Sequence, residues 1–204
     1  MQELKLKRAT YKDIGTISKL AGLIWNQHYP SIIGQKQIDY MLDLMYSPKS
    51  LKEQIQIKKH NFFLIEIDSS VVGFISVNSK KKGEWFLNKF YINQLKAKKG
   101  IGSKVFDLLL ELTNPKKITL TVNRQNYKSI NFYFKKGFKI EKVADFEIGK
   151  NYVMNDFVMA WRKKNWLGAF EFHAETCFFI TEIDILGSDF THNQFNQKKW
   201  VTAK

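Results

Sequence analysis

The sequence predicts an α/β fold built on a mixed, mostly antiparallel central sheet flanked by helices. Three β-rich runs follow one another at residues 62–67, 71–77 and 85–92, and the chain then alternates strands with helices as far as residue 161. Consecutive strands joined by short turns pair antiparallel, and the later alternation adds the layered helices of an α/β protein. The 44% hydrophobic and 25% charged content, with 11 Gly and 3 Pro, excludes a disordered or collagen-like chain.

The first sixty residues predict one strand and three helices. Residues 4–7 alternate Leu and Lys, which is the pattern of a half-buried strand. Apolar residues then recur at helical spacing, predicting a helix that Asp13 opens and that ends near Trp25. Residues 35–46 predict a second helix, and residues 47–58 predict a third, because proline at the second of these positions suits a first helical turn.

The rest of the chain predicts turns and alternating elements. Asp68-Ser69-Ser70 separates two of the β-rich runs as a hairpin turn, and lysines 80–82 with Gly83 form the next turn. Period and turn residues then predict a helix over 102–113, a strand over 117–122, a helix over 126–136 and two strands over 138–143 and 152–161.

The charge of the chain favours an anionic partner but not a nucleic acid. The net charge is +14, and all of it lies in residues 1–162, because residues 163–204 hold five lysines and five acids. A basic surface concentrates phosphates. The only arginines are Arg8, Arg124 and Arg162, whereas specific nucleic-acid readers favour arginine. We therefore favour solvated lysine surfaces over a nucleic-acid surface.

Other features bound the class of protein. Cys177 is the single cysteine, which excludes an intramolecular disulfide and a cysteine-based zinc cluster, and no metal is predicted. No apolar run approaches the roughly 18 residues of a membrane helix. Residues 1–10 lack the apolar core of a secretory signal. We therefore expect a cytoplasmic protein without a membrane partner.

A glycine-containing turn between a predicted strand and a predicted helix is the first chemical signal. It reads Lys98-Lys99-Gly100-Ile101-Gly102-Ser103-Lys104. Such a turn exposes backbone N–H groups beside the positive end of a helix, which together form an anion cradle. Val105 stands where a dinucleotide fingerprint needs glycine, and the order Gly-Ser-Lys differs from a Walker loop. A plain structural turn is the alternative interpretation.

A second segment follows the next predicted strand and changes the interpretation of the turn. It carries Asn123, Asn126, Ser129, Tyr133 and Gly137-Phe138 at fixed spacing. With both segments in this order, the chain resembles the GCN5-related N-acetyltransferase (GNAT) superfamily over about residues 4–161. Residues 89–92 and 152–159 are similar to its bacterial spermidine/spermine N-acetyltransferase subgroup.

This resemblance implies an activity and a cosubstrate. Residues 1–162 would form a GNAT-type N-acetyltransferase domain that uses acetyl-CoA. The acetyl group would pass to a primary amine, either a polyamine or another small amine, by direct attack in a ternary complex. The turn at residues 98–104 would hold the pyrophosphate, and the strand backbone at Phe90, Tyr91 and Ile92 would pair with the pantetheine.

The resemblance also assigns roles on the second segment. Asn126 and Ser129 would flank the pantetheine, and Tyr133 would protonate the departing thiolate as general acid, because a phenol with a reference pKa of about 10 is protonated at neutral pH. Taken alone, these residues have structural alternatives: a helix cap for Asn126, a packing role for Ser129 and a core tyrosine for Tyr133.

The general base and the acceptor site are not identified by the sequence. Glu84 stands where the superfamily sometimes has a base, although a solvated turn residue is the alternative. His28 and Tyr29 lie where the acceptor-side loop is expected, with a structural histidine as the alternative for His28. A polyamine would need local acids, for which the candidates are Asp145, Glu147 and Asp156.

Two further features leave alternatives open. Ala97 replaces the usual Gln or Arg at the start of the turn, which together with the lysine-rich surface motivates a rival function: a non-catalytic acetyl-CoA-binding or nucleic-acid-associated regulatory module on the same fold. Residues 163–204 form an aromatic-rich C-terminal extension. It would pack on the core, act as a dimerisation arm that makes a homodimer, or be a fortuitous extension; we favour the first two.

Overall fold

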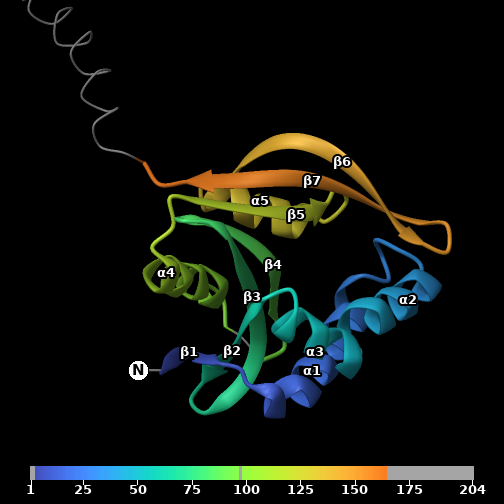
Figure 1. Cartoon of the computed structure of the whole chain (residues 1–204), viewed down its shortest axis with the longest axis horizontal. Coiled ribbons are helices and arrows are strands. Elements are labelled where there is room, and N and C mark those ends of the chain that lie inside the picture. The colour runs from blue at the N-terminus through green and yellow to red at the C-terminus, as the bar shows by residue number, and fades with distance from the viewer. Residues whose placement is uncertain (1–2, 97, 165–204) are drawn as a thin grey trace, which may run out of the picture. The chain divides into compact units, whose positions relative to one another are not determined.

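A seven-stranded mixed sheet organises the protein, in the order β1-β2-β3-β4-β5-β7-β6 (Figure 1). The computed structural model describes residues 3–96 and 98–164, so the predicted extension lies almost wholly outside the described residues. All neighbouring strands pair antiparallel except β4 and β5, which are parallel. The predicted mixed, mostly antiparallel sheet is therefore confirmed. The strands are β1 (Leu4–Arg8), β2 (Asn61–Ile67), β3 (Ser70–Lys81), β4 (Glu84–Ile92), β5 (Lys117–Asn123), β6 (Lys139–Gly149) and β7 (Tyr152–Arg162).

The helices follow the sequence periodicity closely. They are the 3-10 helix η1 (Tyr11–Asp13) and the α-helices α1 (Ile14–His28), α2 (Gln35–Tyr46), α3 (Pro48–Gln56), α4 (Ile101–Thr113) and α5 (Tyr127–Lys135). In the described part of the chain, no helix has the length and apolar character that crossing a bilayer requires.

Several element boundaries differ from the predictions. Helix α1 runs to His28 instead of ending near Trp25, because Trp25 is buried and stacks on Tyr29 at a centroid distance of 4.4 Å, which holds the last turn against the core. Strand β6 continues to Gly149, well beyond residue 143. It is an exposed edge strand, so its pairing with β7 rather than its hydropathy decides its length.

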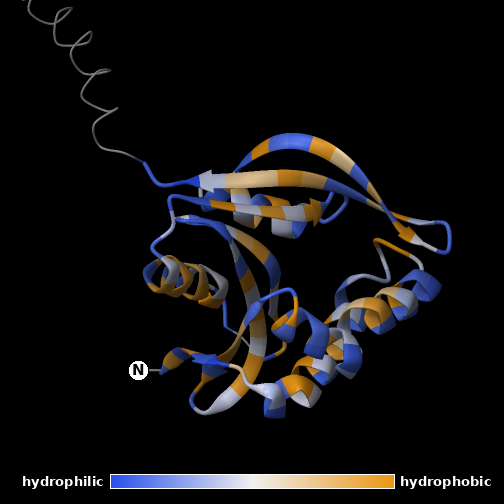
Figure 2. Cartoon of the chain, viewed as in Figure 1, coloured by the Kyte–Doolittle hydropathy of each residue, from blue (hydrophilic) through white to orange (hydrophobic). Residues whose placement is uncertain are grey.

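Each face of the sheet carries its own hydrophobic core. The core under α4 and α5 includes Val105, Leu109, Leu120 and Phe138. The core under α1, α2 and α3 includes residues from those helices and from the opposite faces of β2 and β3. Figure 2 shows hydrophobic and hydrophilic residues mixed along α1 and α4, as expected for helices with one buried side. The chain therefore has two separately packed layers around one sheet.

Strands β4 and β5 separate partway along their length. Their parallel register covers only three pairs, which end at Phe86 and Thr119. Strand β4 also has a bulge, because Ser76 opposes Lys89 while the next residue of β3 opposes Leu87, which leaves Asn88 as the extra residue. Beyond this point one edge of β4 has no β5 partner, and the sheet opens.

Candidate active site

A cleft of 880 Å³ occupies the place where β4 and β5 separate. Its lining comes from the second half of β4, the end of β5, the N-terminal ends of α4 and α5, the end of α1, part of α2 and residues of β7. Because the opening lies within the sheet, one cleft reaches both layers of the fold. All of the predicted site residues except Lys104 line this cleft. The predicted residues are Phe90, Tyr91, Ile92, Lys98, Lys99, Gly100, Ile101, Gly102, Ser103, Lys104, Asn126, Ser129 and Tyr133.

The open edge of β4 presents main-chain groups of two predicted residues. Asn93 N donates to Val72 O at 2.8 Å, and a Cβ placed on Gly73 would collide with the Tyr91 carbonyl oxygen. Tyr91 therefore directs its peptide groups towards β3. Because hydrogen-bonding directions alternate along a strand, Phe90 and Ile92 direct theirs to the unpaired edge. Tyr91 also lines the cleft, and its predicted pairing with the pantetheine stays a prediction.

The glycine turn lies at the N-terminus of α4. Gly100 is the N-cap residue, and its φ of 92° is in the left-handed region that favours glycine. Lys98 and Lys99 line the same end of the cleft, and Lys128 reaches it from α5, where its Nζ lies 3.4 Å from Gln94 Oε1. Cations on two sides, together with the positive end of a helix, make this end suitable for a polyanion.

Lys128 was missed by the sequence analysis. It lies two residues after Asn126, in the first turn of α5, and the only signal in the sequence was its nearness to that motif. Lys104, by contrast, is exposed on α4 and lies outside the lining. Ala97 is outside the described residues.

The first turn of α5 joins the two layers. Asn126 Oδ1 accepts a hydrogen bond from Ser129 N at 3.2 Å and so caps the helix, as its structural alternative predicted. The same oxygen lies 3.2 Å from His28 Nε2 at the end of α1. Asn126 therefore fixes the start of α5 against α1, and His28 and Ser129 both reach the cleft.

Tyr133 lines the cleft from the buried side of α5. Its ring packs against Phe132 and Phe138, at centroid distances of 5.4 and 5.2 Å. Burial, and secondarily the neighbouring Tyr29, raise the pKa of Tyr133 well above its usual value. The phenol is therefore a protonated hydrogen-bond donor throughout the neutral range.

Aromatic side chains form the wall on the α1 side of the cleft. Trp25 stacks on Tyr29, and the Tyr46 and Tyr91 rings meet edge-to-face at 6.3 Å. Burial is the main cause that raises the pKa of Tyr29, Tyr46 and Tyr91, so all three remain neutral. These residues come from three elements, and no local sequence pattern links them.

Lys89 is a buried cation on the same side of β4. The residue is 7% exposed, and Nζ lies 5.0 Å from the centroid of the Tyr46 ring and 5.8 Å from that of the Phe62 ring. Burial, and to a lesser degree the charge of Lys58, lower the pKa of Lys89 to about 8. Keeping the Lys89 ammonium charged in the folded state therefore lowers the free energy of unfolding.

Replacing Lys89 with methionine should stabilise the protein near pH 7 by up to about 3 kcal/mol, because each pKa unit corresponds to about 1.4 kcal/mol. Below pH 8 Lys89 is charged in both the folded and the unfolded state, so the full free-energy cost of burying its charge lowers the stability of the wild type. Between pH 8 and about 10.5 only the unfolded state stays charged, so the advantage of the variant should decline to nothing. Urea unfolding across this range measures the effect. The exposed Lys12→Met is the control, and a Lys89→Met variant less stable than the wild type at pH 7 would contradict the prediction.

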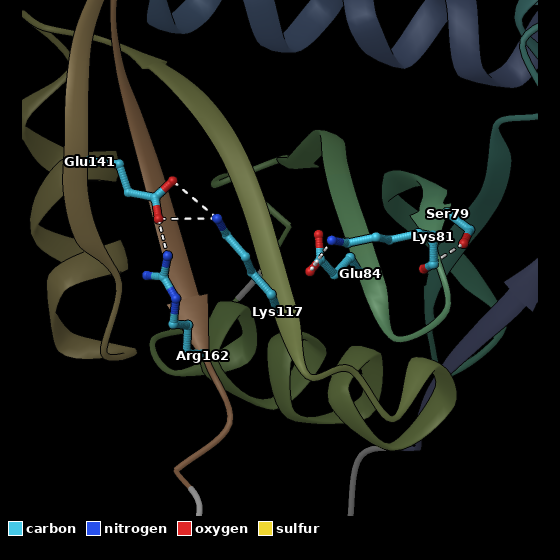
Figure 3. A network of polar contacts seen from close by, with 6 residues as sticks. All are labelled: Ser79, Lys81, Glu84, Lys117, Glu141 and Arg162. Atoms are coloured by element: carbon cyan, nitrogen blue, oxygen red, sulfur yellow. Dashed lines mark hydrogen bonds and ion pairs between the residues drawn. The ribbon is translucent and has the colours of Figure 1, made fainter.

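Glu84 is the first residue of β4 and is not among the residues that line the cleft. Its carboxylate pairs with Lys81 across the β3–β4 turn at 3.2 Å. Beside it in Figure 3, Glu141 pairs with Lys117 and Arg162 across β5, β6 and β7, and these two cations lower the pKa of Glu141. Glu84 is therefore a surface ion-pair residue, in agreement with its structural alternative.

Asp156 is the one acidic residue among the described residues that line the cleft. It lies on β7, opposite Asn123 of β5, and is 5% exposed. Of the three acids proposed from sequence as acceptor-binding groups, Asp145 pairs with Arg124 and Glu147 is exposed. Of these three acids, Asp156 is therefore the one that lies in the cleft, and the sequence alone did not distinguish it from the other two.

These features define a class of protein. The overall fold, in which the sheet splits between β4 and β5, is similar to the folds of solved acetyltransferases. Residues 33–151, more than half of the chain, match the acetyltransferase (GNAT) domain family. The chain belongs to this family and is an N-acetyltransferase.

Individual relatives agree with the family. The chain is 26% identical over 159 residues to a spermidine N(1)-acetyltransferase of Thermoplasma acidophilum, covering 73% of this chain and 98% of the relative. Among solved structures it is similar to the PaiA N-acetyltransferase of the same organism in complex with coenzyme A, with a TM-score of 0.64, 23% identity and coverage of 79% and 99%. It is also similar to a spermidine N-acetyltransferase of Vibrio cholerae in complex with CoA and spermine, with a TM-score of 0.57, 19% identity and coverage of 80% and 98%. Two of these three relatives are named as spermidine acetyltransferases.

Proposed function

We propose that the protein transfers the acetyl group of acetyl-CoA to a primary amine, with polyamines as the first class to test, by direct attack in a ternary complex. The observation that carries this proposal is the single cleft that connects three groups: the lysine-lined glycine turn, the open edge of β4, and Tyr133. An elongated, anionic thioester needs a site for its phosphates, partners for its amide groups and a proton donor for its sulfur, and these three features would supply them.

The donor would bind along the split in the sheet. Its phosphates suit the N-terminus of α4 beside Lys98, Lys99 and Lys128. Its pantetheine arm carries amide groups, which suit pairing with the unpaired edge of β4 as an added strand does. The N–H groups of Phe90 and Ile92 point to that edge, so one of them would polarise the thioester carbonyl as negative charge develops on its oxygen.

The chemistry would need one acid and a neutral amine. The amine nitrogen attacks the thioester carbon, the C–S bond breaks, and the thiolate takes a proton from the Tyr133 hydroxyl. The proton that the nitrogen loses then returns to the Tyr133 oxygen, so the products are the amide and the free thiol. The phenol carries its proton until the thiolate forms, because burial raises the pKa of Tyr133. The names of the relatives in the comparison support a polyamine as acceptor.

Two measurements test this function. Calorimetric titration of the full chain with acetyl-CoA should give saturable binding, and a panel of amines headed by spermidine should release the CoA thiol with time. Product mass should show one added acetyl group on the amine. Binding without release of thiol for any amine would instead favour the non-catalytic acetyl-CoA-binding module, and absence of binding at millimolar acetyl-CoA would contradict the proposal.

A further inference from the structure

We propose that Asp156 binds the ammonium group of the acceptor amine and takes the first proton from it. This inference rests on the proposed N-acetyl transfer and assigns the recognition of the acceptor's charge to one side chain. Three observations support it: the position of Asp156 in the fold, the lack of an ion-pair partner for its carboxylate among the described residues, and the aromatic side chains that line the same part of the cleft.

Asp156 lies on the opposite face of the sheet from the glycine turn. Along β5, Leu120 and Val122 belong to the core under α4 and α5, so the alternate residues Thr121 and Asn123 face the other layer. On β7, Met154 packs into the core under α1, α2 and α3, and Asp156, two residues later, shares that face. The carboxylate therefore enters the cleft from the α1 side, and a donor held at the N-terminus of α4 would approach from the other side.

The charge of Asp156 has no ion-pair partner among the described residues. The nearby Arg124 pairs with Asp145, which also accepts from Asn155 Nδ2 at 2.8 Å. Desolvation raises the pKa of Asp156 above its usual value, and the repulsion from Asp145 adds to this, while the Thr121 hydroxyl and the charge of Arg124 act against it. Leaving a buried carboxylate without a cation is costly, and a cationic ligand removes that cost.

The neighbours of Asp156 suit an ammonium group. Tyr29 and Asp156 both line the cleft, and the charge of Asp156 is one of the smaller causes that raise the pKa of Tyr29, after burial and Tyr91. Tyr29 stacks on Trp25, and both line the cleft. Aromatic rings attract ammonium groups through their π faces, and a carboxylate beside them supplies the countercharge. This half of the cleft therefore offers an ammonium group a carboxylate and aromatic faces beside the buried Lys89, whereas the other half is lined by Lys98, Lys99 and Lys128.

The proton steps balance with the groups present. The bound ammonium gives one proton to the Asp156 carboxylate, and the resulting neutral amine forms the N–C bond to the thioester carbon. When the C–S bond breaks, Tyr133 gives its proton to the thiolate and receives the second proton lost by the nitrogen. Asp156 then releases its proton to water, so each turnover yields the amide, the free thiol and one proton. A carboxylate whose pKa is raised is better suited to accept that first proton.

The test compares Asp156→Asn with Glu147→Gln in the full chain. Each change removes one acidic charge, but Glu147 is exposed on β6 and lies outside the cleft lining. With spermidine as the probe, Asp156→Asn should lower kcat/KM by about 100-fold or more, with the Kd for acetyl-CoA changed by less than about twofold. Glu147→Gln should keep both values within about twofold of the wild type.

A second readout does not depend on turnover. Spermidine should raise the melting temperature of the wild type, and also that of Asp156→Glu, which retains the carboxylate, but not that of Asp156→Asn. Asp156→Asn should itself melt no lower than the wild type, because it removes a buried, unpaired charge.

The outcomes separate this inference from the proposed function. If the wild type acetylates spermidine and Asp156→Asn does so with an unchanged kcat/KM and an unchanged pH profile, the inference is wrong and the function stands. If the wild type neither binds acetyl-CoA nor acetylates any amine, both are wrong. A spermidine-dependent melting shift that persists in Asp156→Asn would also overturn the inference.

Discussion

Tyr133→Phe should lower kcat by about 100- to 1000-fold and leave the Kd for acetyl-CoA within about twofold of the wild type. The substitution removes only the hydroxyl, and the ring keeps its packing against Phe132 and Phe138. The thiolate would then leave without a positioned proton donor. Steady-state release of the CoA thiol measures kcat, and calorimetry measures the binding constant.

The same helix offers a matched control for Tyr133. Tyr127 lies in the first turn of α5 and is 70% exposed, so Tyr127→Phe should change neither kcat nor Kd. The pH profile adds a second test: burial raises the pKa of Tyr133, so kcat of the wild type should not decline where a solvent-exposed phenol titrates, near pH 10. A Tyr133→Phe variant that retains full kcat would assign this residue to the core alone.

Gly102→Glu should weaken acetyl-CoA binding by at least about 100-fold, which corresponds to about 2.7 kcal/mol. The new carboxylate would stand at the N-terminus of α4, where the phosphates are expected, and would also neutralise the lysines of the turn. A Cβ at Gly102 would meet Phe132 Cε2 at 3.5 Å, an ordinary contact, so the fold should accept the side chain.

Two further variants separate charge from shape at this position. Gly102→Ala should keep acetyl-CoA binding within a few-fold of the wild type, since it adds the Cβ without the charge. Gly15→Glu makes the same charge change on an exposed, open position of α1 and should leave binding unaltered. Calorimetric titration compares all three. Gly100 is less informative, because its φ of 92° strains any other residue. Equal weakening by Gly102→Ala and Gly102→Glu would contradict an electrostatic role for this turn.

Local patterns in the sequence predicted most elements of the fold. The apolar spacing of α4 and the alternation of β5 are local periodicities, so each could be identified without knowledge of its neighbours. The glycine turn is also a local pattern. The spacing from Asn126 to Tyr133 is local too, because Asn126 caps α5 and Tyr133 lies on the buried side of the same helix. Prediction was weakest for β6, whose length depends on pairing with β7.

Burial of charge could not be predicted from the sequence. Lys89 belongs to a lysine-rich chain in which solvated lysine is the general expectation, yet its position after the β4 bulge places it against Tyr46 and Phe62. From the sequence, Asp156 could not be distinguished from Asp145 and Glu147 as an acceptor-binding acid. The pairing of β7 with β5 is what places it in the cleft. Whether a charge is buried depends on which distant residues cover it.

The sequence by itself determined the elements, the glycine turn and the family motif, because these are set by residues near one another in the chain. Tertiary structure alone decided where β4 and β5 separate, which main-chain groups of β4 stay unpaired, and that Lys128, Tyr29 and Asp156 meet the motif in one cleft. The physical reason is that strand pairing is non-local: helix α4 and its flanking segments lie between β4 and β5 in the chain, and only the packed sheet fixes the register that brings these side chains together.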